Sequence, residues 1–184
     1  MRRSLEARVG WRLWLATALV FAAFLVAVLP AVARTTLEIT GTSASPDSAY
    51  LYTAQDLYRW AGAYGEEGRA HYVRSRFTFD VVWPLAYGLF LQVSLLLASR
   101  ATVVVARLPF VFVLTPTLAV LFDFLENASA ALVMARYPAT TPVVAHAAPV
   151  FTFVKWNVLG LAFALAGLGG LAWLVPGLRR AGGG

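Results

Sequence analysis

Four long apolar stretches run along the chain, with charged residues between them. Three of them contain no charged residue at all: those between Arg12 and Arg34, between Asp80 and Arg100, and between Lys155 and Arg179. The fourth, from Pro109 to Ala135, is interrupted only by Asp123, Glu126 and Asn127. A helix of any of these lengths can span a hydrocarbon core of roughly 30 Å, because each residue adds about 1.5 Å.

This pattern predicts an all-α fold: a polytopic membrane four-helix bundle that forms one domain over residues 1–184. The predicted spans cover about residues 11–33, 70–99, 108–135 and 145–176. A large outer loop, about residues 34–69, joins the first two spans. Gly167, Gly169 and Gly170 in the last span are small enough to let another helix approach closely.

The outer loop begins with a polar segment and continues with a short amphipathic helix. Residues Thr35 to Ala49 are rich in Thr, Ser, Pro and Asp, a composition typical of exposed loop. Thr53 and Asp56 then have the spacing of a capping box. Leu57, Trp60, Ala61 and Tyr64 follow at helical spacing, and Gly65 ends the pattern. We expect this helix either to lie at the membrane surface or to pack on the bundle.

Composition and charge support insertion into a lipid bilayer rather than binding to nucleic acid. The chain is 60% hydrophobic, with a mean hydropathy of +0.70, a net charge of +6 and a pI near 10.2. Its basic residues gather at helix ends instead of forming one stripe, which indicates orientation and predicts no nucleic-acid partner. Those on the predicted inner side are Arg2, Arg3, Arg8, Arg12, Arg100, Arg107, Arg179 and Arg180. The positive-inside rule therefore predicts that both termini are cytoplasmic.

An alternative interpretation of the amino terminus remains open. Arg2 and Arg3 precede an apolar run that ends in Ala31-Val32-Ala33, a pattern typical of signal-peptide cleavage. The run is longer than a usual signal-peptide core, which favours an uncleaved membrane anchor. A cleaved chain would keep three spans with the same orientation.

Ionisable residues recur at similar depth in three of the four predicted spans. Asp80, Asp123, Glu126 and Lys155 lie in the outer halves or near the middle of their helices, and we predict that they form a catalytic group. The cost of exposing them to lipid requires that they face the bundle interior. Helical spacing places further polar and aromatic residues beside them, as predicted substrate-binding residues: Arg69, Tyr72, Arg76, Trp83, Tyr87, Asn127 and Trp156.

Charge balance within this group favours proton chemistry. Lys155 neutralises only one of the three acids, although Arg76 can reach Asp80 from one helical turn away. A carboxyl group without a cation, beside an ion pair, is suited to proton transfer. The alternative is structural, with buried Asp–Lys and Glu–Arg pairs that lock helix packing. Asn157 lies on another side of its helix from Lys155, so we interpret it as a packing contact.

Other chemistries find little support. The chain has no cysteine, and His71 and His146 lack the spacing of a metal-binding motif, so we predict neither a metal site nor a cofactor. Phosphate-binding loops and a nucleophile elbow do not occur.

Three functions are compatible with these features. The first is an intramembrane enzyme that isomerises, cyclises or hydrolyses a small lipid-like molecule. The second is a non-catalytic membrane subunit that binds a partner through its outer loop, in particular residues Tyr50 to Gly65. The third is transport of protons or a small cation. A largely apolar inner half argues against transport by one chain, whereas a homo-oligomer could build a path.

Several short motifs resemble those of a group of uncharacterised bacterial four-helix membrane proteins. They are Tyr64-Gly65, Gly68-Arg69, Tyr72, Asp80, Pro84, Tyr87, Asp123, Glu126-Asn127 and Lys155-Trp156. The resemblance implies a four-helix membrane fold, and we expect the protein to lie in a bacterial inner (plasma) membrane. It implies no activity.

Overall fold

The computed structural model describes residues 9–179, and within that range the chain folds as an all-α bundle. In this part of the chain four helices are long and apolar enough to cross a membrane: Trp11–Thr40, Gly65–Ala101, Thr115–Arg136 and Pro142–Leu174. The predicted fold class, a polytopic membrane four-helix bundle, is confirmed. The predicted inner-side arginines Arg2, Arg3, Arg8 and Arg180 lie outside the described residues.

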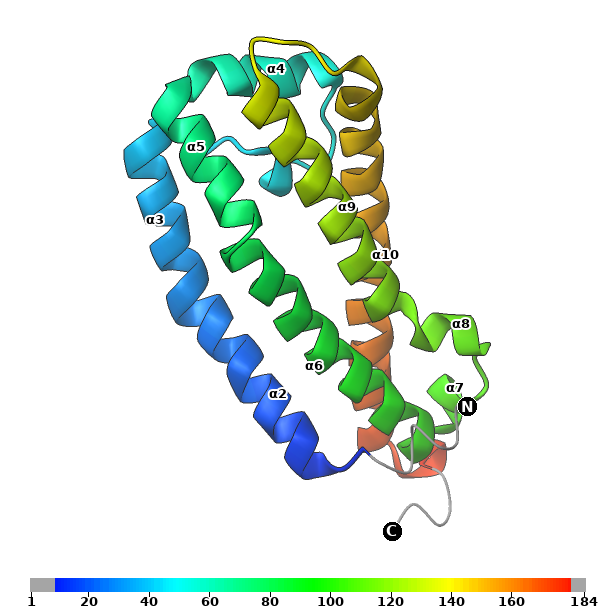
Figure 1. Ribbon diagram of the computed structural model, residues 1–184. Coiled ribbons are helices and arrows are strands. Elements are labelled where there is room, and N and C mark those ends of the chain that lie inside the picture. The colour runs from blue at the N-terminus through cyan, green and yellow to red at the C-terminus, as the bar shows by residue number, and fades with distance from the viewer. Residues whose placement is uncertain (1–8, 180–184) are drawn as a thin grey trace.

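The first span is one helical rod along the side of the bundle (Figure 1). It consists of α2 (Trp11–Ala23), a π-helical turn (Phe24–Val28) and α3 (Leu29–Thr40). The π-helical turn ends two residues before Pro30, which has no backbone N–H for an ordinary helical hydrogen bond. α2 packs on α6 and α3 packs on α5. The most apolar part of this span has no residue buried within the protein, so its apolar side chains face outward from the bundle.

The first span extends further than the sequence predicts. Residues Thr35 to Thr40 were expected to begin the outer loop, but they are helical, and this prediction is wrong for them. Threonine hydroxyls donate back to helix carbonyls, from Thr35 to Ala31 at 3.2 Å and from Thr40 to Thr36 at 2.8 Å, so these polar side chains are satisfied within the helix. The helix ends only at Gly41, whose φ of 69° is one that glycine adopts easily.

The predicted amphipathic helix is α4 (Ala54–Ala63), and it packs on the bundle. Thr53 and Asp56 form the predicted capping box. Leu57 and Ala61 are fully buried against α9 and α10, so the apolar face of α4 is covered by its own chain. Packing of a loop helix, one of the two expected placements, is the one observed.

The second span is two helices, α5 (Gly65–Arg76) and α6 (Phe79–Ala101), separated by a break at Phe77 and Thr78. At the break, the N–H groups of these two residues donate to the carbonyls of Arg74 and Ser75, three residues back instead of four. Arg76 and Asp80 therefore lie on either side of a local bend.

α9 (Thr115–Arg136) and α10 (Pro142–Leu174) pack along each other and complete the bundle. The third span begins at Thr115, later than the expected residue 108. Two single helical turns, α7 (Val103–Ala106) and α8 (Phe110–Val113), fill the connection from α6. Pro109 and Pro116 explain the later start, because proline disfavours helix before it and is well accommodated in a first turn.

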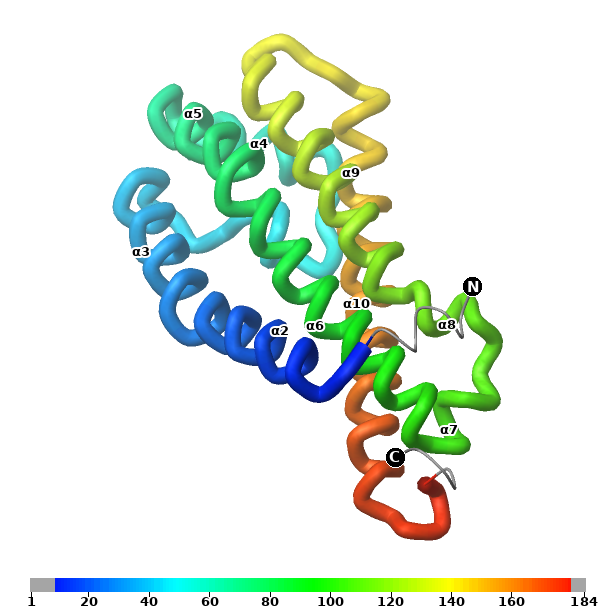
Figure 2. Tube along the Cα trace, turned by 60° about the horizontal axis from the view of Figure 1, so that its bottom comes forward, coloured from blue at the N-terminus to red at the C-terminus, as the bar shows by residue number. Residues whose placement is uncertain are grey.

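The two ends of the bundle differ. At one end, which we call the α4 end, α4 crosses over α9 and α10 (Figure 1). At the other, which we call the termini end, the first and last described residues lie close to the end of α6 (Figure 2). The Arg100 guanidinium donates to the Val9 carbonyl at 2.6 Å, and Thr102 forms an isolated β-bridge with Arg179.

Candidate functional site

The predicted ionisable residues converge inside the bundle. Asp80 and Asp123 are each 8% exposed, Lys155 is 4% exposed and Glu126 is fully buried. We use the name buried polar cluster for these four and the side chains joined to them, either directly or through Arg76 and Asp47. Its members are Asp47, Tyr72, Arg76, Asp80, Tyr87, Asp123, Glu126, Asn127 and Lys155.

Glu126 and Lys155 form a buried ion pair between α9 and α10. The other carboxyl oxygen of Glu126, Oε1, has no hydrogen-bond partner among the described residues. The Lys155 ammonium also lies 5.1 Å from the centre of the Trp156 ring. Burial makes this pair a fixed dipole with one unused acceptor, because neither charge reaches water.

Asp123 is held by neutral donors. The Tyr87 hydroxyl donates to Asp123 Oδ2 at 2.7 Å, and the Asn127 amide donates to Oδ1 at 3.0 Å. In the described part of the chain, Asp123 forms no ion pair. The bond to Tyr87 depends on a close crossing of α6 and α9: a Cβ at Gly88 would lie 2.4 Å from Val120 Cγ2.

Arg76 links the two sides of the buried polar cluster. Its guanidinium pairs with Asp80 at 2.9 Å and donates to Asn127 Oδ1 at 3.2 Å. It also lies over the Tyr72 ring, 4.4 Å from the centre. The predicted contact between Arg76 and Asp80 forms across the break between α5 and α6. Asn127, bonded to both Arg76 and Asp123, connects the arginine to the carboxyl that has no cation.

Asp47 belongs to the buried polar cluster, and sequence reasoning missed it. It lies in the loop after α3, on a single 3-10 turn (Pro46–Ser48) that packs on α9 and α10. Its carboxylate pairs with Arg76 and accepts from the Tyr72 hydroxyl at 3.0 Å and the Ser45 hydroxyl at 2.8 Å. A lone loop carboxylate has no periodic spacing, so nothing in the sequence pointed to it.

The surroundings lower the pKa of Asp47. Burial by itself would raise the pKa, but the positive charges of Arg76 and Lys155 and the hydrogen bonds from Arg76 and Ser45 outweigh that effect. Asp47 is therefore held as a carboxylate, and Lys155 is close enough to contribute. The described cluster thus has four carboxyl groups, Asp47, Asp80, Asp123 and Glu126, for two cations, Arg76 and Lys155.

The loop that carries Asp47 also carries Tyr50 and Tyr52, and both tyrosines bond to α10. Tyr52 and Thr152 share a hydrogen bond of 3.0 Å between their hydroxyls. Burial raises the pKa of Tyr52, and the carboxylates of Glu126 and Asp47 add to that rise. Tyr50 exchanges hydrogen bonds with Asn157, the nearer at 3.0 Å. Asn157 is exposed and bonds to the loop, not to the buried polar cluster. This placement agrees with its interpretation as a packing contact.

Three of the predicted substrate-binding residues lie at the edge of the buried polar cluster or apart from it. Arg69 donates to the Ala61 carbonyl at 2.9 Å and stacks on Tyr137. Trp83 stacks on Phe21 and Phe24 of the first span, with its edge against Tyr87. Trp156 is 37% exposed, and its ring lies 5.1 Å from the Lys155 ammonium.

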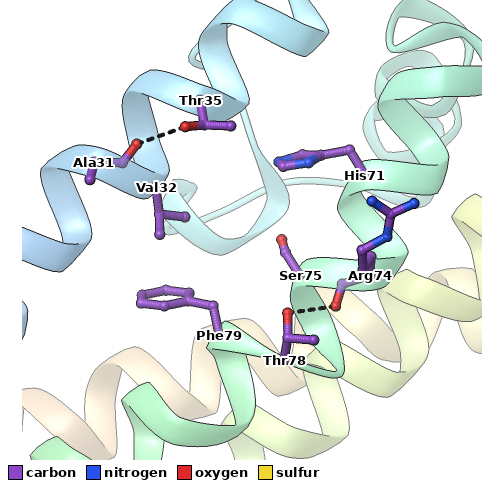
Figure 3. Close-up of a pocket in the computed structure, with 8 residues that line it drawn as sticks. All are labelled: Ala31, Val32, Thr35, His71, Arg74, Ser75, Thr78 and Phe79. Carbon is purple, nitrogen blue, oxygen red and sulfur yellow. Dashed lines mark hydrogen bonds between the residues drawn. The ribbon is translucent and has the colours of Figure 1, made fainter.

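A pocket of about 280 Å³ lies beside the break in the second span. Figure 3 shows Val32 and Thr35 of α3 on one side of it and His71 and Ser75 on the other, with the ring of Phe79 below Val32. Arg74, Ser75, Thr78 and Phe79 flank Arg76 and Asp80 in sequence. The pocket therefore adjoins the segment that carries two members of the buried polar cluster.

Comparison with protein-family models, with curated proteins and with solved structures finds no match to this chain. Within residues 9–179, no group of three or more His, Asp or Glu side chains is arranged to hold a metal ion.

Proposed function

We propose that this chain is an intramembrane acid/base enzyme that acts on a small lipid-like substrate carrying an anionic or carbonyl group. The observation that carries the proposal is the environment of Asp123. This carboxyl group is buried, and among residues 9–179 it is bonded only to the neutral donors Tyr87 and Asn127, although two cations lie within the same cluster. A group in that position is suited to take up and release a proton.

The neighbouring residues have complementary roles in the proposal. Tyr87 bonds directly to Asp123 and relays its proton. The Glu126–Lys155 pair supplies a fixed dipole near the reacting atoms, in a low-dielectric site where electrostatic stabilisation is strong. Arg76, with Asp80 as its support, binds the anionic group of the substrate. When no substrate is bound, the carboxylate of Asp47 pairs with Arg76 where the anionic group of the substrate would bind. A proton-transfer reaction such as isomerisation fits best, because it needs no co-reactant.

The pocket between α3 and α5 supports access from the lipid. On the side of the first span it is lined by Ala31, Val32 and Thr35, and it lies against the break next to Arg76. Its volume of about 280 Å³ is at the lower limit of small-molecule sites, which is roughly 300 Å³. A lipid-like substrate could enter there sideways without crossing the loop that closes the α4 end.

The two other functions find less support. The apolar face of α4 is buried on its own bundle, so it offers little surface to a partner. In the half toward the termini end, the Gln92 amide donates to the Val113 carbonyl at 2.8 Å and accepts from Thr117 at 3.1 Å. These polar groups satisfy one another and do not continue a path for ions.

The test is incubation of the purified protein, in lipid nanodiscs, with a total lipid extract of its native membranes, followed by mass spectrometry. We expect a product with the wild type and with the control Glu38→Gln, which removes an exposed carboxylate of α3. Asp123→Asn should reduce the product by about 10²-fold or more, the usual contribution of acid–base catalysis. Identical profiles for wild type and a folded Asp123→Asn variant would contradict the proposal.

A further inference from the structure

A second site lies in the opposite half of the bundle, at the termini end. It is a groove of about 870 Å³ between α2, α6 and α10, well within the range of roughly 300–1,000 Å³ for ligand sites. Its lining is mainly apolar and aromatic, with Trp11, Trp14 and Trp173 among the side chains. It shares no residue with the buried polar cluster, so the proposed acid/base chemistry does not use it.

The length of the groove matches one leaflet of a bilayer. Along α6 its lining runs from Phe90 to Ala101, which is about 16 Å at 1.5 Å per residue. Half of a hydrocarbon core of roughly 30 Å is about the same length. α2, which forms one wall, belongs to the span whose apolar part is not buried within the protein. The groove is therefore placed where an acyl chain can enter it from the surrounding lipid.

The mouth of the groove is positively charged. Arg100 is part of the lining. The Arg12 guanidinium lies 5.8 Å from the centre of the Trp11 ring, and the Arg179 guanidinium lies 4.9 Å from that of Trp173. Both of these rings line the groove. The segments that build this end, residues 9–33, 92–114 and 158–179, contain no Asp or Glu. The charges of these described segments therefore favour an anionic group here.

Glycines of α10 provide the space on one side of the groove. A Cβ added at Gly167 or at Gly170 would meet nothing within 4 Å, although both residues line the groove. Gly169 is different, because a Cβ there would lie 2.5 Å from the Cβ of Ala98 on α6. Of the three glycines expected to permit close helix approach, Gly169 brings the helices together, while Gly167 and Gly170 leave room for a ligand.

We propose that this groove binds one anionic phospholipid of the leaflet at the termini end. One acyl chain lies against Gly167 and Gly170 among the tryptophans, and the phosphate lies at the mouth near Arg12 and Arg179. Under the predicted orientation this is the cytoplasmic leaflet, where basic pockets between membrane helices bind anionic headgroups. The bound lipid anchors α2, the least buried helix, to α6 and α10.

The experiment measures lipid retained by the full-length protein after detergent washing, by native mass spectrometry with phosphatidylglycerol or phosphatidylcholine as probe. Gly167→Leu/Gly170→Leu fills the groove, and Gly160→Leu is the matched control, since Gly160 also has open space around its Cβ position but lies outside the lining. We expect wild type and Gly160→Leu to retain phosphatidylglycerol, and the double variant to lose it.

A second variant keeps the proposal testable if the filled groove disturbs folding. Arg12→Gln/Arg179→Gln changes only exposed side chains. It should lower the preference for phosphatidylglycerol over phosphatidylcholine by about fivefold for each arginine that contacts the headgroup. Equal retention of the two lipids by the wild type, or equal retention by the filled-groove and control variants, would overturn the proposal.

Discussion

Asp47 is the residue that sets the charge balance of the buried polar cluster. Without it, Arg76 and Lys155 would face three carboxyl groups; with it they face four. Nη1 of Arg76 contacts both the carboxylate of Asp47 and the amide oxygen of Asn127, while Nη2 pairs with Asp80. Asp47 and Asp80 pair with Arg76, and Glu126 pairs with Lys155. Asp123 accepts hydrogen bonds from the neutral side chains of Tyr87 and Asn127.

Asp47→Asn should lower the free energy of unfolding by about 1–3 kcal/mol at neutral pH, because it removes a charge-assisted bond to Arg76. The pKa of Asp47 in the folded protein lies below its unfolded value of about 3.9. Its stabilisation is therefore complete above that pH and is lost as the pH falls through the folded pKa. Thermal unfolding in detergent over a pH series measures this effect.

The control for this prediction is Glu67→Gln, which removes an exposed carboxylate from the first turn of α5. We expect the difference between wild type and Asp47→Asn to shrink at acid pH, and the Glu67→Gln variant to show no comparable loss. A stability difference that stays the same at every pH would mean that the carboxylate charge of Asp47 is not what stabilises the fold.

At the scale of elements, the crossing of α6 and α9 places Tyr87 within reach of Asp123. The crossing is close because Gly88 presents no side chain to Val120. The break between α5 and α6 has a similar role, since it separates Arg76 from Asp80 and still lets them pair at 2.9 Å. Helical periodicity correctly placed both residues on one side of this span, but it did not reveal the break.

Gly88→Ala should destabilise the protein by about 1–3 kcal/mol, the usual cost of overpacking, because the new Cβ would lie 2.4 Å from Val120 Cγ2. It should also weaken the bond between Tyr87 and Asp123 and reduce any activity that depends on it. Gly160→Ala is the matched control in α10, where a Cβ meets nothing within 4 Å. Unfolding in detergent compares the two. Equal stability of both variants would show that α6 and α9 can separate without cost.

At the scale of the whole molecule, the two proposed sites lie in opposite halves of the bundle. The buried polar cluster lies toward the α4 end, and the lipid groove lies at the termini end, where the described charged residues are arginines. This distribution of charge also underlies the predicted orientation, with both termini in the cytoplasm.

The absence of cysteine from the sequence allows a direct test of orientation. Ala139→Cys places a thiol in the exposed connection between α9 and α10, and Gly177→Cys places one at the termini end. A membrane-impermeant maleimide should label Ala139→Cys in intact cells, and Gly177→Cys only after the membrane is permeabilised. The reverse pattern would contradict the orientation, and labelling of both in intact cells would contradict the topology.

The sequence by itself determined the membrane bundle, the amphipathic α4 and the inward placement of Asp80, Asp123, Glu126 and Lys155. These features follow from hydropathy and helical periodicity. Both are properties of a single continuous segment, so they can be recognised in the sequence of that segment alone. Only the tertiary structure decided that Asp47 pairs with Arg76, that Asp123 has neutral partners, and that Gly167 and Gly170 border a groove. Such pairings join segments far apart in the chain, so they depend on how loops run and helices cross.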